Sequence, residues 1–229
     1  MNGHKTMDQA MATATAALVQ RHDMADVLAH LLDDCAEVLR VAAVAILVRD
    51  DEDLSLLSAT SHRAADLEVL QIQETSGPCV DVVASGSSFE VSGAERLVAR
   101  WGEVGEAIVA AGYDSVASFP LRWRDTVVGG LNVFGTATDA PVDPTLGQAF
   151  ADVATLVLLH SSDVPDDQVS ARVHEAVAAR AQVEQAKGVL AYVHHLDMGT
   201  AYELLRTIAA MSGESLTEAA RRIVREQHR

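Results

Sequence analysis

The sequence predicts an α+β domain with an antiparallel sheet flanked by helices, followed by a bundle of three helices. Apolar runs of strand length, rich in β-branched residues, predict the sheet; they lie at 41–48, 54–59, 115–122 and 127–134. Helical patterns before, between and after these pairs of runs indicate an α+β domain rather than an all-β one. Three consecutive stretches near the C-terminus repeat apolar residues every three or four positions, which predicts the bundle of amphipathic helices.

The sheet domain is expected at residues 23–160, after a lead-in at 1–22 that is polar at first and then alanine-rich, as in a frayed helix. Asp23 can cap the first helix, because its carboxylate can accept a hydrogen bond from a free N–H group of the first turn. Asp143 and Pro144 begin the closing helix. The segments expected between the two strand pairs are a helix at 65–72, a short helix after Gly77-Pro78, a strand at 88–91 and a helical stretch at 94–111.

The helical domain is expected at residues 169–229, with its first helix running to Tyr192. Asp197 can cap the second helix, and the glycine of Ser212-Gly213 can end it. The four residues from Ser215 to Glu218 have the sequence of a capping box, which predicts the start of the third helix.

Charge is divided unevenly between the two domains. The chain has a net charge of −16. From Ser170 to the C-terminus it holds eight Lys or Arg against seven Asp or Glu, whereas the preceding residues hold nine against twenty-six. This asymmetry supports two domains with different tasks, joined at a polar and acidic boundary, 161–168, where Pro165 also suits a helix start. It predicts weak non-specific affinity for nucleic acids, since few phosphates could be neutralised.

Composition indicates a globular cytoplasmic protein. Apolar residues make up 49% of the chain, so a sizeable core is available, and no uncharged apolar run approaches the length of about 20 residues that a membrane span needs. The first residues contain no apolar signal segment. Cys35 and Cys79 are far apart in the sequence, which is typical of reduced cysteines rather than of a disulfide framework.

No catalytic residue, metal site or cofactor is assigned from the sequence. The nine histidines are scattered, and the adjacent His194 and His195 would point about 100° apart on a helix. Cys79 follows Gly-Pro near a predicted helix start, a position that would lower the pKa of its thiol. We favour a small buried side chain at Cys79 and therefore do not expect an enzyme.

Motifs in the three C-terminal helices resemble the ANTAR domain, the RNA-binding module of transcription antitermination regulators. These motifs are Ala186-Lys187-Gly188, Ala201-Tyr202-x-Leu204-Leu205-Arg206 and Ala219-Ala220-x-x-Ile223-Val224, within a match from Val169 to Glu226. In ANTAR relatives the target is a pair of short stem-loops in a nascent transcript, and holding it prevents a terminator hairpin from forming. The resemblance therefore implies structured RNA as the partner.

The sheet domain resembles a GAF domain, a small-molecule sensor fold often joined to ANTAR domains in actinobacterial regulators. The residues that carry this resemblance, from about Asp23 to His160, are Gly77-Pro78-Cys79-Val80, Arg100-Trp101, Gly112-Tyr113-x-Ser115-Val116, Phe119-Pro120-Leu121-Arg122 and Gly129-Gly130-Leu131-Asn132-Val133-Phe134. Gly102 departs from the proline expected after Trp101. The resemblance implies an unknown small-molecule ligand and a role in pairing two chains as a homodimer.

The candidate RNA-binding residues are cations on the three helices. In decreasing order of expectation they are Lys187, Arg180, Arg206 and then Arg221, Arg222 and Arg225. Arg180 and Lys187 share one stripe of the first helix with Glu184 between them, so an ordinary surface ion-pair row is the alternative interpretation. Tyr192, His194 and His195 are candidates for stacking on RNA bases; Tyr202 is expected in the core, and a glutamate follows Ser212-Gly213 where relatives often have basic residues.

Two small residues of the first helix are expected to have a packing role. Glycine inside a helix costs about 1 kcal/mol relative to alanine, so Gly188 implies the close approach of another helix. Ala186 is assigned to the same packing site.

Two other functions remain open from the sequence. The three helices could form a protein-interaction module whose cations only maintain solubility, or a helix-turn-helix that binds DNA. The slope of affinity with salt would separate RNA binding from apolar docking, and competition between duplex DNA and hairpin RNA would identify a DNA-binding protein.

Overall fold

The structure is a computed structural model that describes residues 5–19, 23–51, 53–159 and 169–227. It contains a five-stranded sheet in which every pair of neighbouring strands is antiparallel, in the order β2-β1-β5-β4-β3. The strands are β1 (Ala43–Asp50), β2 (Asp53–Ala59), β3 (Phe89–Ser92), β4 (Ser115–Trp123) and β5 (Thr126–Gly135). Together with the helices below, this sheet confirms the predicted α+β class.

The centre of the sheet is covered on both faces. Residues 43–48 of β1 are all buried, as expected for an apolar strand between two layers of helices. Two glycines of β5 permit close packing there. A Cβ atom on Gly129 would lie 2.3 Å from the carbonyl oxygen of Leu47, and one on Gly130 would lie 2.8 Å from the sulfur of Cys79.

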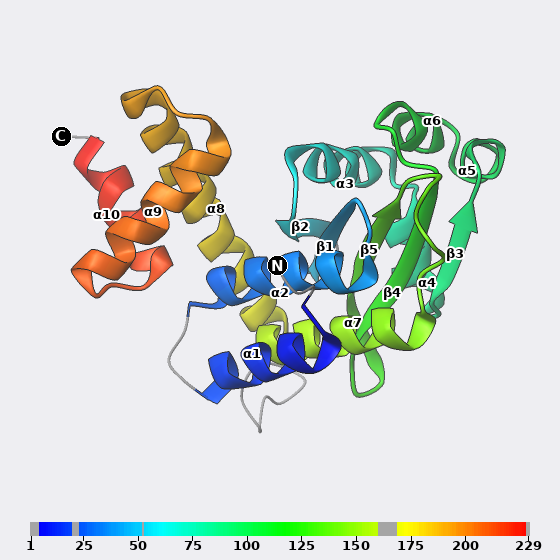
Figure 1. The fold of residues 1–229 in the computed structure, drawn as a ribbon, viewed down its shortest axis with the longest axis horizontal. Helices are drawn as coiled ribbons and strands as arrows, with labels where there is room; N and C mark the ends of the chain where they lie inside the picture. The colour runs from blue at the N-terminus through cyan, green and yellow to red at the C-terminus, as the bar shows by residue number, and fades with distance from the viewer. Residues whose placement is uncertain (1–4, 20–22, 52, 160–168, 228–229) are drawn as a thin grey trace.

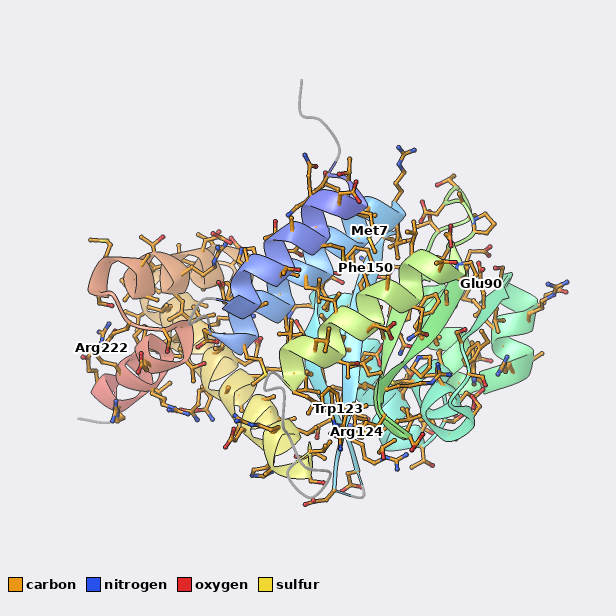
Figure 2. All side chains as sticks on the ribbon, turned by 90° about the horizontal axis from the view of Figure 1, so that it is seen from below. Met7, Glu90, Trp123, Arg124, Phe150 and Arg222 are labelled. Carbon is orange, nitrogen blue, oxygen red and sulfur yellow. The ribbon has the colours of Figure 1, made fainter. Side chains whose placement is uncertain are left out.

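Helices cover the two faces of the sheet (Figure 1). On one face lie α1 (Met7–Val19), α2 (Met24–Leu39) and α7 (Pro144–Leu158). On the other face lie α3 (His62–Glu74), α4 (Pro78–Ser85), α5 (Ala94–Trp101) and α6 (Glu103–Ala110). Figure 2 shows Phe150 on α7, whose side chain is buried in the first of these layers.

Two parts of this domain differ from the sequence-based expectation. The lead-in contains a packed helix, α1, whose Ala10 and Ala14 are buried in the same core as α2 and α7. The single helical stretch expected at 94–111 is two helices, because Gly102 takes a left-handed φ of 53° between α5 and α6. A left-handed φ is unavailable to proline, which accounts for the glycine after Trp101.

The helical domain consists of α8 (Val169–His194), α9 (Met198–Ser212) and α10 (Leu216–Gln227). Its predicted start and stop signals are confirmed. Asp197 accepts a hydrogen bond from the Thr200 N–H at 3.0 Å, and Gly213 ends α9 with a φ of 68°. Ser215 and Glu218 exchange the two hydrogen bonds of a capping box, at 3.2 and 2.9 Å.

Helix α8 belongs to both domains. Its first part places Val169, Val173 and Ala176 in the core formed with α2 and α7, whereas its second part places Ala186 and Leu190 in the core of the three helices. Val193, three residues after Leu190 on the same helix, is 44% exposed. The helix start expected within 161–168 lies outside the described residues.

Candidate nucleic-acid interface

The candidate cation Arg180 faces the sheet domain rather than solvent. Its Nη1 atom donates a hydrogen bond of 3.0 Å to the carbonyl oxygen of Leu56 on β2. Burial lowers the pKa of the Arg180 guanidinium, and the nearby Glu184 carboxylate partly offsets that effect. In this conformation Arg180 therefore links the helical domain to the sheet domain.

Lys187 is held by a carboxylate of its own helix. Its ammonium lies 2.9 and 3.0 Å from the two carboxylate oxygens of Glu184, and only 13% of the side chain is exposed. The ammonium also lies 5.5 Å from the centroid of the Tyr202 ring, within the range of a cation–π contact. Of the ion-pair row considered around Glu184, the pair with Lys187 is thus present; its lysine is largely buried, whereas 38% of the Glu184 side chain is exposed.

Arg206 on α9 also contacts the sheet domain. Its Nε atom lies 3.2 Å from Oδ1 of Asp26 on α2, and its Nη1 atom lies 3.5 Å from Glu203 on its own helix. About a third of the Arg206 and Asp26 side chains remains exposed. This ion pair links the two domains at a partly buried position.

A third contact joins the domains through a backbone N–H group. Asp23 accepts a hydrogen bond of 2.9 Å from Ala25 N–H through Oδ1, which caps α2. Its other oxygen, Oδ2, accepts a hydrogen bond of 2.7 Å from Thr217 N–H in the first turn of α10. One carboxylate thus serves the N-termini of two helices from different domains.

A cleft of about 250 Å³ lies between the domains. From the helical domain it is lined by Arg180, Glu184, Lys187 and Tyr202, and from the sheet domain by residues of α2, β2 and the start of α3. Tyr202, expected in the core, instead lies partly buried at this cleft. The structure therefore brings Arg180 and Lys187 together, as predicted, but against the other domain.

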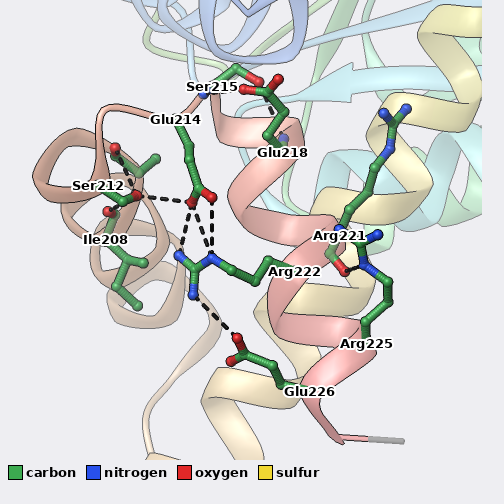
Figure 3. Close-up of polar contacts among 10 residues, drawn as sticks. Ile208, Ser212, Glu214, Ser215, Glu218, Arg221, Arg222, Arg225 and Glu226 are labelled. Carbon is green, nitrogen blue, oxygen red and sulfur yellow. Dashed lines mark hydrogen bonds and ion pairs between the residues drawn. The ribbon is translucent and has the colours of Figure 1, made fainter.

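The arginines of α10 divide into two groups (Figure 3). Glu214 binds the guanidinium of Arg222 at 3.1 Å from Nε and 2.9 Å from Nη2. Hydrogen bonds from Arg222 lower the pKa of the Glu214 carboxyl. Glu214, the residue after Ser212-Gly213, therefore neutralises Arg222, so this arginine is not free to bind a phosphate.

Arg221 and Arg225 lie on another side of α10 and are exposed (Figure 3). The Arg225 Nε atom donates to the backbone oxygen of Arg221 at 3.1 Å. Among the described residues, neither guanidinium forms an ion pair with a carboxylate. These two arginines had the lowest expectation, yet they are the candidate cations most accessible to a ligand.

The three candidate stacking residues at the end of α8 are exposed. The exposed fraction of Tyr192 is 83%, and His194 and His195 are also exposed. An exposed aromatic ring in this position can stack on an unpaired base. The end of α8 therefore remains compatible with base stacking.

The expected helix contact at Gly188 is wrong. Gly188 is exposed, and a Cβ atom built on it would meet no heavy atom of the described residues within 4 Å. The neighbouring Ala186 is fully buried among the three helices. The two residues are about 200° apart on α8, so only Ala186 faces the bundle.

Replacing Gly188 with alanine is expected to stabilise the protein by about 1 kcal/mol, because alanine favours the helix and the site has room for the methyl group. Urea unfolding measures this gain. Gly105→Ala is the matched control, since its Cβ atom would lie 2.2 Å from the backbone oxygen of Leu97 and should destabilise. A Gly188→Ala protein with unchanged or lower stability would contradict the open environment of this glycine.

A buried polar cluster in the sheet domain was not anticipated from the sequence. Glu68 on α3 accepts hydrogen bonds from Asn132 Nδ2 at 2.8 Å and from Gln71 Nε2 at 3.0 Å. Gln71 Oε1 accepts from Cys79 N–H at 2.9 Å, and Ser118 Oγ donates to Asn132 Oδ1 at 2.7 Å. Burial raises the pKa of Glu68 to about 8, partly offset by the hydrogen bond from Asn132.

Helical spacing could have revealed this cluster. Ala64, Leu67, Glu68 and Gln71 are the buried residues of α3, and their spacing of three, one and three residues defines one face. A carboxylate and an amide on an apolar helix face are a signal of a buried polar site.

The environment of Cys79 does not favour a reactive thiolate. Its side chain is fully buried, and burial raises the pKa of the thiol well above its usual value. Burial also raises the pKa of Cys35. A thiolate is the nucleophilic form of cysteine, so neither side chain is prepared for nucleophilic chemistry in this conformation.

Within residues 5–19, 23–51, 53–159 and 169–227, no group of three or more His, Cys, Asp or Glu side chains is placed to hold a metal ion. None of the helices in those ranges combines the length and the apolar character that crossing a membrane requires.

Comparison with protein families matches both parts of the chain. The model of the GAF domain matches residues 21–159, and the model of the ANTAR domain matches residues 171–224. No match was found among curated proteins.

Solved structures match the sheet domain. A GAF domain from an Acinetobacter phosphoenolpyruvate-protein phosphotransferase is 15% identical, with 70% of this chain and 96% of that chain covered and a TM-score of 0.52. A GAF domain/HD domain protein from Geobacter sulfurreducens is also 15% identical, with 62% and 96% covered and a TM-score of 0.50. At such identities the likeness shows the fold alone.

Proposed function

Because the chain belongs to the GAF-domain family and continues into an ANTAR domain, we propose that it is an RNA-binding regulator of transcription antitermination. In this proposal the helical domain binds a pair of short stem-loops in a nascent transcript and prevents a terminator hairpin from forming. The sheet domain receives a signal and controls that binding. A protein acting on nascent transcripts would work in the cytoplasm of a bacterium.

The exposed arginines of α10 are the observation that best supports RNA binding. Arg221 and Arg225 are open to solvent and form no ion pair with a described carboxylate, in a chain whose net charge is −16. An arginine in this state can neutralise an RNA phosphate without first breaking an ion pair with a carboxylate. The exposed ring of Tyr192 offers a separate surface for stacking on a loop base.

Replacing Arg221 and Arg225 with alanine is expected to weaken binding to an RNA with two stem-loops by about tenfold or more, as two phosphate contacts are lost. The slope of log affinity against log salt should also become shallower by about 1.4, at about 0.7 per contact for single-stranded loops. Gel-shift titrations at several salt concentrations measure both effects. Arg172→Ala is the control, because Arg172 is also exposed on a helix but pairs with Glu175.

The same titrations test the other functions considered for this domain. Unchanged affinity and slope in the double variant would reject the assignment of Arg221 and Arg225 to RNA. Duplex DNA that displaces hairpin RNA would indicate a DNA-binding regulator instead. Absence of binding to either nucleic acid would favour a protein-interaction module.

We propose no catalytic activity and no metal or cofactor for this chain, and the buried thiol of Cys79 supports that view.

We also propose that two chains pair as a homodimer, because a target with two stem-loops suits two ANTAR domains. Sedimentation velocity with and without the RNA tests the pairing.

A further inference from the structure

We propose that this conformation is a closed state in which the sheet domain occupies part of the RNA-binding surface. This inference rests on the proposed function, and it concerns the regulation of the same site. It is carried by three contacts, which we call the interdomain latch: Asp26 with Arg206, the Leu56 carbonyl with Arg180, and Asp23 with the Thr217 N–H group.

All three acceptors of the latch come from one side of the sheet domain. Asp23 and Asp26 lie at the beginning of α2, and Leu56 lies on the edge strand β2. All three donors belong to the helical domain, one on each of its helices. A movement that separates α2 and β2 from the helical domain would break the three contacts together.

The latch uses the chemistry by which RNA phosphates are bound. Guanidinium groups bind carboxylate and phosphate oxygens through the same charge-assisted hydrogen bonds. The Arg206 Nε atom and Asp26 Oδ1 lie 3.2 Å apart as an ion pair, and Asp26 Oδ1 accepts no hydrogen bond within the described residues. A phosphate that binds this side of Arg206 has to displace the Asp26 carboxylate. Asp26 therefore acts as an internal competitor of RNA for Arg206.

Asp23 occupies a second anion-binding position. The N-terminus of a helix favours an anion because its free N–H groups and its dipole both face outward. Here the 2.7 Å contact with Thr217 N–H is filled by a carboxylate from another domain, some 194 residues earlier in the chain. This observed anion shows that the start of α10 can accept one.

The surroundings of Arg180 indicate that the closed state can open. Among the described residues, its guanidinium makes one hydrogen bond, to the Leu56 carbonyl, although an arginine has five N–H donors. Its partial burial therefore carries a desolvation cost that this neutral acceptor and the nearby Glu184 carboxylate offset only in part. Opening would return Arg180 to solvent or to a phosphate, which lowers that cost.

In the closed state the exposed arginines are already able to bind RNA. Arg221 and Arg225 are outside the latch, so they can contact RNA before the domains separate. Opening then adds Arg180 and Arg206 to the interface. When only a fraction of molecules is open, the apparent dissociation constant for the full interface is raised in inverse proportion to that fraction.

The test is the full-length double variant Asp23→Asn/Asp26→Asn. Asparagine keeps the cap of α2, because its side-chain oxygen can still accept from Ala25 N–H. Asp26→Asn removes the negative charge beside Arg206, and Asp23→Asn removes the negative charge at the N-terminus of α10. We expect this variant to bind the two-stem-loop RNA at least about tenfold more tightly than the wild type.

A matched control separates the latch from the general effect of charge. Glu95→Gln/Glu106→Gln removes the same two negative charges from exposed positions on α5 and α6. Helix α5 contacts both α6 and β3, and β3 carries Glu90, which lies at the end of the molecule opposite Arg222 (Figure 2). The control should change RNA affinity by less than about twofold. Equal gains in the two double variants would overturn the latch.

A second measurement needs no RNA. Phenylglyoxal modifies accessible arginines, and mass spectrometry can follow each site in the full-length protein. Arg180 and Arg206 should react several-fold faster in the Asp23→Asn/Asp26→Asn variant, whereas Arg221 should react equally in both proteins. If no variant binds RNA, the proposed function fails, and these reactivities still decide the latch. Unchanged reactivity of Arg180 and Arg206 would overturn it.

Discussion

Replacing Glu68 with glutamine is expected to stabilise the protein by about 3 kcal/mol at pH 7, with a gain that disappears near pH 4. Burial raises the pKa of Glu68 from its usual 4.5 to about 8 in the folded protein. Between those two values the unfolded chain has lost the proton and the folded protein still holds it. Because the unfolded state then binds fewer protons, stability falls as the pH rises from about 4.5 to about 8.

The glutamine can take the place of a protonated Glu68 in the same hydrogen bonds. Its side-chain oxygen can accept from Gln71 Nε2, whose orientation is fixed because Gln71 Oε1 accepts from Cys79 N–H. Its side-chain nitrogen can donate to the Asn132 oxygen after that amide turns over, and the Ser118 hydroxyl can accept in return. Both neutral side chains need the same rearrangement of Asn132, so the variant removes the ionisation and little else.

Urea unfolding at a series of pH values between 4 and 9 checks this prediction. The wild type and Glu68→Gln should have similar stability near pH 4 and should diverge as the pH rises. Glu74→Gln is the control on the same helix, since Glu74 is exposed. Parallel curves for all three proteins would mean that Glu68 ionises normally in the folded state.

Features that depend on neighbours in the sequence could be predicted. Asp23 and Asp197 cap their helices, and Ser215 with Glu218 forms the capping box, because each of these signals acts within three residues. The strands β4 and β5 were predicted for the same reason, from apolar runs of strand length at 115–122 and 127–134.

Features that depend on contacts between distant segments could not be predicted. The alanine-rich sequence of α1 does not reveal that Ala10 packs with α2 and α7. The stripe that carries Arg180 and Lys187 was predicted correctly on α8, but the pattern of one helix cannot show which side another domain will cover. Lys187 and Arg180 had the highest expectation among the candidate cations and are partly buried. Arg221 and Arg225 on α10 had the lowest expectation and are exposed.

Replacing Leu205 with alanine is expected to cost about 3 kcal/mol and to unfold the helical domain before the sheet domain. Leu205 is fully buried at the centre of the small cluster of α8, α9 and α10. A leucine-to-alanine change in a core removes about 2 to 5 kcal/mol, through lost burial and the cavity left behind. Met211→Ala is the control on the same helix, because the methionine is 85% exposed and its loss should change stability by less than about 0.5 kcal/mol.

Two spectroscopic signals can separate the domains in this experiment. Both tryptophans of the chain, Trp101 and Trp123, lie in the sheet domain, so their fluorescence reports on that domain. Far-ultraviolet circular dichroism reports on all helices, including α8 to α10. In Leu205→Ala, part of the circular dichroism signal should be lost at a lower urea concentration than the fluorescence signal.

The position of α8 decides how far the two transitions can separate. Val173 and Ala176 pack in the sheet domain, while Ala186 and Leu190 pack in the helical domain, so one helix enters both cores. Loss of the second core leaves the first part of α8 with its own buried contacts, which allows the sheet domain to persist. Coincident loss of both signals in Leu205→Ala would instead mean that α8 and the interdomain latch make the whole chain one cooperative unit.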